Sequence, residues 1–101
     1  MAHVSFVRAK VLPGKKQAVI DQFEKWRREQ KPAAKGFERS IMVFSNNDPD
    51  ELMGAVRFDT TENYVANANR PAQDAWYREL RALLAADPVW FDGTLGIETL
   101  A

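Results

Sequence analysis

Apolar and polar side chains alternate along residues 3–12, and this period of two is typical of a β-strand with two different faces. One face is small and aliphatic, whereas the other mixes Phe6 with the cations Arg8 and Lys10. Pro13-Gly14 then predicts the end of the strand, because proline has no backbone N–H to donate to a neighbouring strand.

A helical period follows over residues 15–30, where apolar side chains recur every three or four positions. These side chains are Val19, Ile20, Phe23 and Trp26. Charged residues fill most of the other positions, so the segment predicts an amphipathic helix with one buried stripe. Pro32 and Gly36 predict where this helix ends.

Two β-type segments joined by turn residues predict a hairpin. Residues 37–44 and 52–58 are rich in β-branched and aromatic side chains. Between them, residues 45–50 have the sequence Ser-Asn-Asn-Asp-Pro-Asp, which is a dense run of turn formers. We therefore expect the second and third strands here.

The last part of the chain predicts two helical pieces and a final strand. Thr60 is placed to cap a short helix, and Pro71 suits the first turn of the next helix. That second helix is expected to reach about residue 86, with an apolar stripe of Trp76, Leu80, Leu83 and Leu84. Residues 89–100 predict the final strand, which begins after Trp90-Phe91-Asp92-Gly93.

The resulting order, β-α-β-β-α-β, predicts one α+β domain over residues 1–101. It is the ferredoxin-like order, in which the helices cover one face of an antiparallel sheet. The uncovered face would carry Phe6, Met53, Arg57, Glu98 and Leu100. Arg57 and Arg8 are expected to pair with Glu98 of the same or the opposite subunit. Apolar groups beside opposed charges suit contact with a second copy, so we expect a homodimer.

Composition narrows the classes of function. The chain has 14 Lys and Arg, 14 Asp and Glu and a formal net charge of +0, which disfavours nucleic acid and membrane partners. It has no Cys and one His, and we expect that residue, His3, to be terminal and exposed. Zinc binding and Ser-His-Asp catalysis are therefore disfavoured. With no membrane-spanning run or signal segment in the sequence, we expect a cytoplasmic protein.

Three local features, with the length and the element order, resemble the antibiotic-biosynthesis-monooxygenase (ABM-like) family of dimeric α/β-barrel proteins. They are Leu12-Pro13-Gly14, the passage Val56-Arg57-Phe58-Asp59-Thr60-Thr61-Glu62, and Arg70-Pro71 followed by Trp76. The resemblance implies a homodimer whose sheets face each other, with a small-molecule pocket between sheet and helices in each subunit. Known family activities include cofactor-free oxidation of polycyclic phenols and anthrones by O2, quinol oxidation, haem degradation and isomerisation.

Departures from the family pattern sharpen this expectation. Haem-degrading relatives carry an Asn, a Trp and a haem-ligating His where this chain has Val7, Phe58 and no His, which argues against haem oxygenation. Many members have a His in the helix after the third strand, where Asn67 stands here. Of the four pocket residues implied for anthrone oxidation, the Tyr and the Arg carry over, as Tyr64 and Arg78.

Tyr64 and Arg78 are the candidate catalytic residues. The Tyr64 phenol can bind a substrate oxygen, unless the ring only packs on the core with its hydroxyl in water. Arg78 can bind a phenolate or carboxylate through charged hydrogen bonds. The alternative is a surface ion pair with Asp74, one helical turn earlier.

The candidate substrate-binding residues are aromatic or amide side chains, namely Phe58, Asn63, Asn67, Trp76, Trp26 and Trp90. The two Asn lie four positions apart on one helical face, where they can orient a ligand or simply form polar surface. The aromatic side chains can wall a flat substrate or simply belong to the core. Trp90 has a further alternative, a contact in the dimer.

The function favoured by these observations is that of a cofactor-independent monooxygenase, or a related small-molecule enzyme, acting on an aromatic or phenolic compound. Its pocket is expected between the sheet and residues 61–86. We expect no flavin, haem or metal, because no dinucleotide fingerprint, haem-ligating His or metal cluster is evident. The alternatives are a non-catalytic dimeric ligand-binding or stress-associated protein, and an isomerase of the same fold, which would need a general base.

Overall fold

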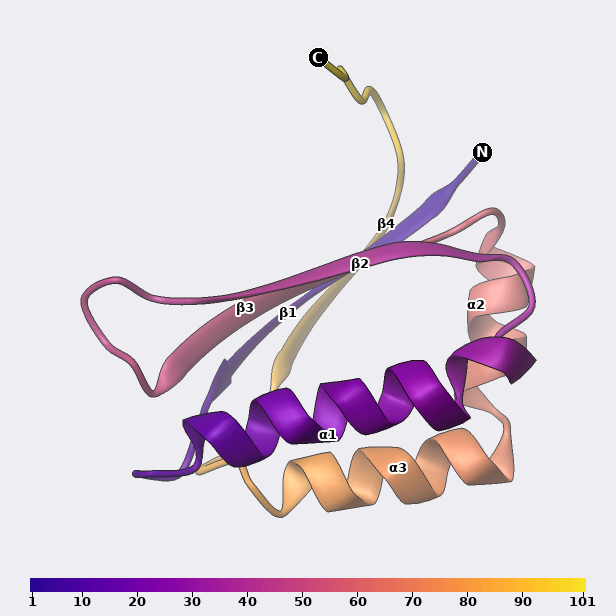
Figure 1. Cartoon of the computed structure of the whole chain (residues 1–101). Coiled ribbons are helices and arrows are strands. Elements are labelled where there is room, and N and C mark those ends of the chain that lie inside the picture. The colour runs from indigo at the N-terminus through magenta and orange to yellow at the C-terminus, as the bar shows by residue number, and fades with distance from the viewer.

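The computed structural model describes all residues 1–101 and has one four-stranded sheet with helices packed on one face (Figure 1). In chain order the elements are β1 (His3–Lys10), α1 (Lys16–Glu29), the short 3-10 helix η1 (Lys31–Ala33), β2 (Phe37–Phe44), β3 (Glu51–Phe58), α2 (Thr61–Ala68), α3 (Pro71–Arg81) and β4 (Val89–Thr94). The ferredoxin-like α+β order is therefore confirmed, with the second helical part divided at Pro71.

The sheet has the strand order β2-β3-β1-β4, and all neighbouring strands are antiparallel. β1 is central, and its residue Ser5 lies between Val56 of β3 and Asp92 of β4. Because side chains alternate along a strand, this register turns all three toward the helices. Phe6 and Phe91, the next pair along, face the opposite side.

The core lies between the covered face of the sheet and the helices. α1 and α3 lie side by side beneath the sheet, whereas α2 covers one end (Figure 1). Reciprocal hydrogen bonds join the two long helices: Trp76 Nε1 donates to the Gln22 carbonyl at 2.8 Å, and Gln22 Nε2 donates to the Trp76 carbonyl at 3.1 Å. The buried Trp76 ring is thus held in one orientation over the sheet.

The predicted helix starts are confirmed. The Thr60 hydroxyl accepts a hydrogen bond from the Asn63 backbone N–H at 3.1 Å, which caps α2. Pro71 is the first residue of α3, where its missing N–H leaves no helical bond unmade. Gly36, before β2, has a φ of +80°, and an added Cβ would lie 2.2 Å from Asp59 Oδ1, so this turn requires glycine.

The predicted ends of two elements are wrong. Trp90-Phe91-Asp92-Gly93 lies within β4 rather than before it, and residues 95–101 lie beyond the strand and extend away from the helices (Figure 1). The reason is the length of β1: Thr94 already pairs with His3, and Leu95 N–H donates to the Ala2 carbonyl at 2.8 Å, after which almost no partner strand remains. α3 also ends earlier than expected, at Arg81.

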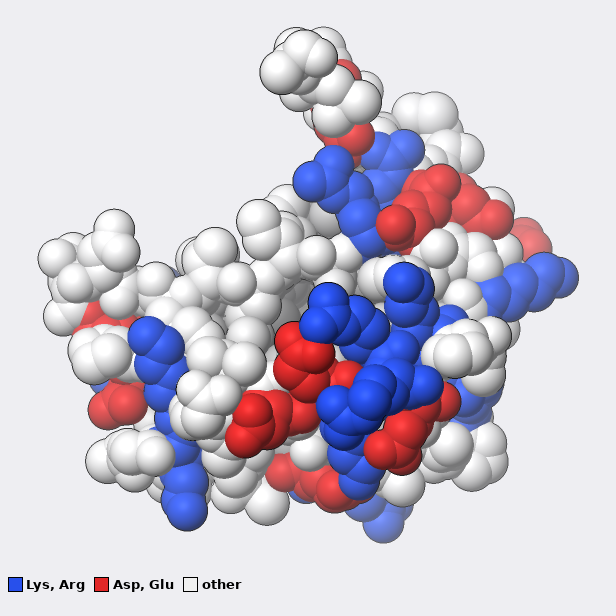
Figure 2. All heavy atoms as spheres, viewed as in Figure 1, with Lys and Arg blue, Asp and Glu red and all other residues white.

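The uncovered face of the sheet carries both apolar and charged side chains. Its large exposed apolar residues are Phe6, Ile41, Val43, Met53, Val89 and Phe91. Arg57 donates to Glu98 of its own chain at 2.7 Å, as expected, and also to Glu38 at 2.7 Å. Arg8 pairs instead with Glu51. Figure 2 shows cationic and anionic side chains next to one another, as these pairs require.

Candidate ligand-binding site

A cavity of about 330 Å³ opens between the covered face of the sheet and helices α1 to α3. Of its 25 lining residues, 18 are hydrophobic, and a few polar groups interrupt the apolar wall. This size and lining are typical of a small-molecule site, for which volumes of roughly 300–1,000 Å³ are usual. Its location agrees with the pocket expected between the sheet and residues 61–86.

Four of the candidate aromatic residues line this cavity: Phe58, Trp26, Trp76 and Trp90. Phe58 and Trp76 are also buried core residues, so each of them belongs both to the core and to the cavity wall. Edge-to-face contacts order the wall, because Phe37 lies 4.9 Å from Trp26 and 5.7 Å from Phe58, measured between ring centroids. The result is a rigid aromatic surface. Substrate binding by these residues stays a prediction.

Tyr64, on α2, lines the cavity with its ring between two other rings. It stacks on His3 with ring centroids 4.1 Å apart, and it meets Phe58 edge to face at 5.6 Å. Burial raises the pKa of the Tyr64 phenol above its usual value, and the negative charge of Asp92 acts in the same direction, whereas a hydrogen bond with Ser5 opposes them. Tyr64 is therefore a protonated, neutral phenol at physiological pH.

His3 is buried, with 3% of its surface exposed, so the expectation of a terminal, exposed residue is wrong. It is the first residue of β1 and faces the helices, where Nε2 lies 2.6 Å from Ser5 Oγ and Nδ1 lies 3.1 Å from Thr61 Oγ1. Ser5 Oγ in turn donates to Asp92 Oδ1 at 2.5 Å. A polar chain therefore runs from Thr61 through His3 and Ser5 to the exposed carboxylate of Asp92.

Proton positions in this chain follow from its chemistry. The Asp92 carboxylate can only accept, so the single Ser5 hydroxyl proton points toward it. His3 Nε2 then donates its N–H to Ser5 Oγ, and Nδ1 forms the second hydrogen bond of the ring with the Thr61 hydroxyl. Every polar atom of the His3 ring has a partner. Ser5, which lines the cavity, is thus joined by a hydrogen bond to a carboxylate that reaches the surface.

Of the two candidate Asn residues, only Asn67 lines the cavity. Asn67 is 9% exposed, and its Oδ1 accepts a hydrogen bond from Arg70 Nε at 3.0 Å. Asn63 is held at the start of α2, where its amide donates to Asp59 Oδ1 at 2.8 Å. Asn67 is thus a residue of the cavity wall, whereas Asn63 binds the loop that precedes α2.

Arg78 lies outside the cavity, which corrects its expected role in binding a ligand there. Its side chain is 79% exposed, and Nε lies 3.0 Å from Asp74 Oδ2, the surface ion pair that was the alternative. The cause is helical geometry: two residues after Trp76, a side chain points roughly 200° around the helix from the buried stripe. The lining residues therefore include no Lys or Arg, and Asp74 is their only charged member.

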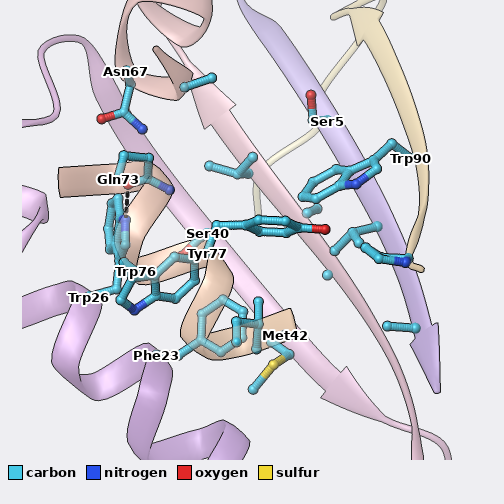
Figure 3. Close-up of a pocket in the computed structure, with 18 of the residues that line it drawn as sticks. Ser5, Phe23, Trp26, Ser40, Met42, Asn67, Gln73, Trp76, Tyr77 and Trp90 are labelled. Carbon is cyan, nitrogen blue, oxygen red and sulfur yellow. Dashed lines mark hydrogen bonds between the residues drawn. The ribbon is translucent and has the colours of Figure 1, made fainter. Parts of the chain in front are cut away.

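Sequence reasoning missed four polar residues of the cavity: Ser5, Ser40, Gln73 and Tyr77. Figure 3 shows the Tyr77 ring reaching from α3 into the middle of the cavity. Gln73 Oε1 accepts a hydrogen bond from Trp26 Nε1 at 2.7 Å (Figure 3). Ser5 was detectable, because it shares the face of β1 that was assigned to the core. Gln73 and Tyr77 flank the apolar stripe of α3, and the sequence pattern does not distinguish them from surface residues.

No three His, Cys, Asp or Glu side chains gather in an arrangement that could hold a metal ion. None of the helices combines the length and apolar character needed to cross a membrane.

No protein-family model and no curated protein matches the sequence. The structure, in contrast, has the ferredoxin-like fold of the ABM-like proteins, and the match extends over most of the chain. A protein of Bordetella bronchiseptica assigned as an antibiotic biosynthesis monooxygenase matches with a TM-score of 0.82 and 15% identity, covering 95% of this chain and 98% of that chain.

Two proteins of Nitrosomonas europaea are similar in the same way. One, also assigned as an antibiotic biosynthesis monooxygenase, has a TM-score of 0.78 at 18% identity and covers 91% of this chain and 88% of its own. The other, of unknown function, has a TM-score of 0.77 at 19% identity and covers 99% and 94%. Identities this low show a shared fold, so the function must be argued from the cavity.

Proposed function

We propose that the protein is a cofactor-independent monooxygenase that binds a small aromatic or phenolic compound in the cavity and oxidises it with O2. The observation that carries the proposal is the position of Tyr64, whose half-buried phenol lines the cavity beside the aromatic wall and near enough to Ser5 and Asp92 for both to affect its pKa. The fold shared with proteins assigned as antibiotic biosynthesis monooxygenases supports the same reaction class.

The reaction needs no electrons from the protein. When a phenol is oxidised to a quinone, one oxygen atom of O2 enters the ring and the other leaves as water with the hydroxyl hydrogen and a ring hydrogen. The substrate itself supplies all four electrons. The task of the protein is to orient the ring, exclude water and accept the substrate proton, since the phenolate gives up an electron more readily than the phenol.

The residues of the cavity suit these tasks. Phe58, Trp26 and Trp76 exclude water and hold a flat ring. Tyr64, which stays protonated, donates a hydrogen bond to the substrate oxygen. The substrate proton passes to the Ser5–Asp92 pair, whose carboxylate reaches the surface. Arg78 takes no part, because its side chain is bound to Asp74 on the surface.

We further propose a homodimer formed through the uncovered face of the sheet, the assembly of a dimeric α/β barrel. The support is the exposed apolar set Phe6, Ile41, Val43, Met53, Val89 and Phe91, because apolar side chains gathered on one face mark contact sites between proteins. The segment 95–101 extends beyond the sheet with Ile97 and Leu100 exposed, within reach of a second copy. The lack of Cys suits a reducing cytoplasm, the location we propose.

A ligand-binding protein without catalysis is the second candidate. The observation that favours it is the absence of any Lys or Arg from the cavity lining, which leaves only neutral donors to stabilise a substrate anion. Turnover distinguishes the two candidates, because both require binding and only the first consumes O2.

Oxygen uptake with 1-naphthol tests the proposal. We expect the protein to consume O2 and form 1,4-naphthoquinone, and Tyr64→Phe to slow this by roughly tenfold, the effect of one well-placed hydrogen bond. Tyr77→Phe is the matched control, since it also removes a hydroxyl from the cavity wall but none that contacts Ser5 and Asp92. Equal losses in the two variants would contradict the role of Tyr64, and binding without O2 uptake would favour the second candidate.

A further inference from the structure

The orientation of the Asn67 amide is fixed by its neighbour. Arg70 Nε can only donate, so the Asn67 atom 3.0 Å away must be the oxygen. Arg70 is itself held by Gln30, with Nη1 3.2 Å from Oε1 and Nη2 3.5 Å from the carbonyl oxygen. The Asn67 NH2 group therefore points away from Arg70 and toward the cavity that the residue lines (Figure 3). It has no hydrogen-bond partner within the chain.

The Gln73 amide is fixed in the same way. The indole N–H of Trp26 can only donate, so the atom 2.7 Å from it must be Gln73 Oε1. Figure 3 shows the Gln73 nitrogen on the opposite side of the amide, directed into the cavity. This nitrogen also has no partner within the chain. Trp26, in α1, and Arg70, the residue before α3, thus fix the orientations of the two amides.

Two N–H donors without a partner in the chain face an apolar cavity. Solvent reaches both nitrogens, since no buried side-chain nitrogen or oxygen lacks a partner, although Asn67 as a whole is only 9% exposed. Water can satisfy both groups in the free protein, whereas a ligand that displaces this water must supply an oxygen atom of its own. The donors lie at the break between α2 and α3, on the wall opposite Ser5 of β1 (Figure 3).

We propose that Asn67 and Gln73 form a two-donor site for the carbonyl oxygen of a neutral aromatic ketone. This deepens the proposed function and rests on it, because it assumes that the cavity is the ligand site. The ligand is neutral because no Lys or Arg lines the cavity and Asp74 does, so a carboxylate or phosphate would lose its hydration without gaining a counter-ion. The opposite wall, with the Ser5–Asp92 pair, accepts hydrogen bonds and suits a hydroxyl group on the same ligand.

A matched pair of probes, 1-tetralone and tetralin, isolates the carbonyl group, because the two bicyclic molecules differ in one C=O in place of CH2. We expect the wild-type protein to bind the ketone about tenfold more tightly by calorimetry, as one to two net hydrogen bonds predict. In amide-resolved NMR spectra, the side-chain NH2 signals of Asn67 and Gln73 should shift with 1-tetralone and not with tetralin. This NMR measurement needs no variant.

Gln73→Glu and Asn67→Asp test the donors directly. Each keeps the oxygen that binds Trp26 or Arg70 and replaces the NH2 donor by an acceptor, so each should abolish the preference for the ketone and leave tetralin affinity nearly unchanged. Gln17→Glu, on the exposed side of α1, is the control for added charge and should retain the preference.

Unchanged preference in both variants, or equal affinity of the wild-type protein for the two probes, overturns the donor site and leaves the proposed function standing. If none of the three compounds 1-tetralone, tetralin and 1-naphthol binds, both proposals are overturned, because the cavity is then not the ligand site. If the protein consumes O2 with 1-naphthol but shows no preference for the ketone, the proposed reaction is supported and the donor site is overturned.

Discussion

The imidazole of His3 lies flat on the phenol ring of Tyr64, with ring centroids 4.1 Å apart and an angle of 22° between the planes. His3 is the first residue of β1 and Tyr64 is in α2, so the contact joins the start of the chain to the helix that closes the cavity. Both nitrogens of His3 are hydrogen-bonded, which fixes the surface on which Tyr64 packs. The only histidine of the chain therefore acts as a support for the candidate catalytic phenol.

His3→Phe tests this support. The variant keeps an aromatic ring on Tyr64 but leaves the Thr61 hydroxyl and one lone pair of Ser5 without their partner, so we expect a loss of about 1–3 kcal/mol in the free energy of unfolding. Urea denaturation measures it. Thr61→Val, which removes only the outer hydrogen bond, should cost less. A His3→Phe protein as stable as the wild type would show that the polar chain contributes nothing to the fold.

The pKa of Tyr64 can be isolated because the chain has only two tyrosines. In Tyr77→Phe, ultraviolet absorbance during alkaline titration reports Tyr64 alone, and we expect a midpoint above the usual value of about 10, because burial disfavours the phenolate. A midpoint at or below that of free tyrosine would contradict the buried position of the hydroxyl.

The raised pKa of Tyr64 should also make the free energy of unfolding depend on pH. Above about pH 10 the unfolded chain loses the Tyr64 proton while the folded chain keeps it, so the free energy of unfolding falls as pH rises toward the folded pKa. Below about pH 10 both states are protonated and the contribution is complete. The difference in stability between wild type and Tyr64→Phe should therefore shrink between pH 9 and 11, as measured by urea denaturation at each pH.

Two residues of α3 should respond in opposite ways to truncation. Trp76→Ala is expected to cost roughly 3–5 kcal/mol of stability, because the ring is buried and its indole N–H binds Gln22 of α1. Arg78→Ala should change stability by less than about 0.5 kcal/mol, because its ion pair with Asp74 is exposed. Arg78→Ala should also leave ligand affinity unchanged. A large loss of ligand affinity in that variant would show that Arg78 takes part in ligand binding.

Sedimentation tests the proposed dimer. We expect a dimer at micromolar concentration, and Phe91→Lys should produce a monomer, because it introduces a charge into the exposed apolar set. Val65→Lys, a substitution at an exposed apolar position on α2, should leave the dimer intact. A wild-type protein that sediments only as a monomer would refute the dimeric barrel.

The element order could be predicted because it depends on local patterns: the period of two in β1, the helical stripe around Phe23 and the helix start marked by Pro71. The end of β4 could not be predicted from its own residues. It is set by the start of β1, where Thr94 pairs with His3 and the partner strand is exhausted. A strand boundary of this kind is a property of two distant segments.

The apolar wall of the site was predictable, and so were Tyr64 and Asn67, whereas Gln73 and the Ser5–Asp92 pair were not. Phe58 and Trp76 belong to periodic stripes, so their side of the sheet follows from spacing. The Ser5–Asp92 hydrogen bond joins residues 87 positions apart, and the sequence pattern placed Asp92 in the segment that leads into the last strand. Gln73 and Arg78 both look like surface residues of α3, and only the packing of Trp26 against the helix brings Gln73 into the cavity.

Oxidation of 1-naphthol under ¹⁸O2 tests the central claim most directly, because the label shows whether an oxygen atom of O2 enters the product. We expect the wild-type protein, free of added cofactor, to form 1,4-naphthoquinone with one ¹⁸O atom in each molecule and to release the other as water. Tyr64→Phe should do so more slowly. Tight binding of 1-naphthol with no labelled product would contradict it, and the protein would then be a ligand-binding protein.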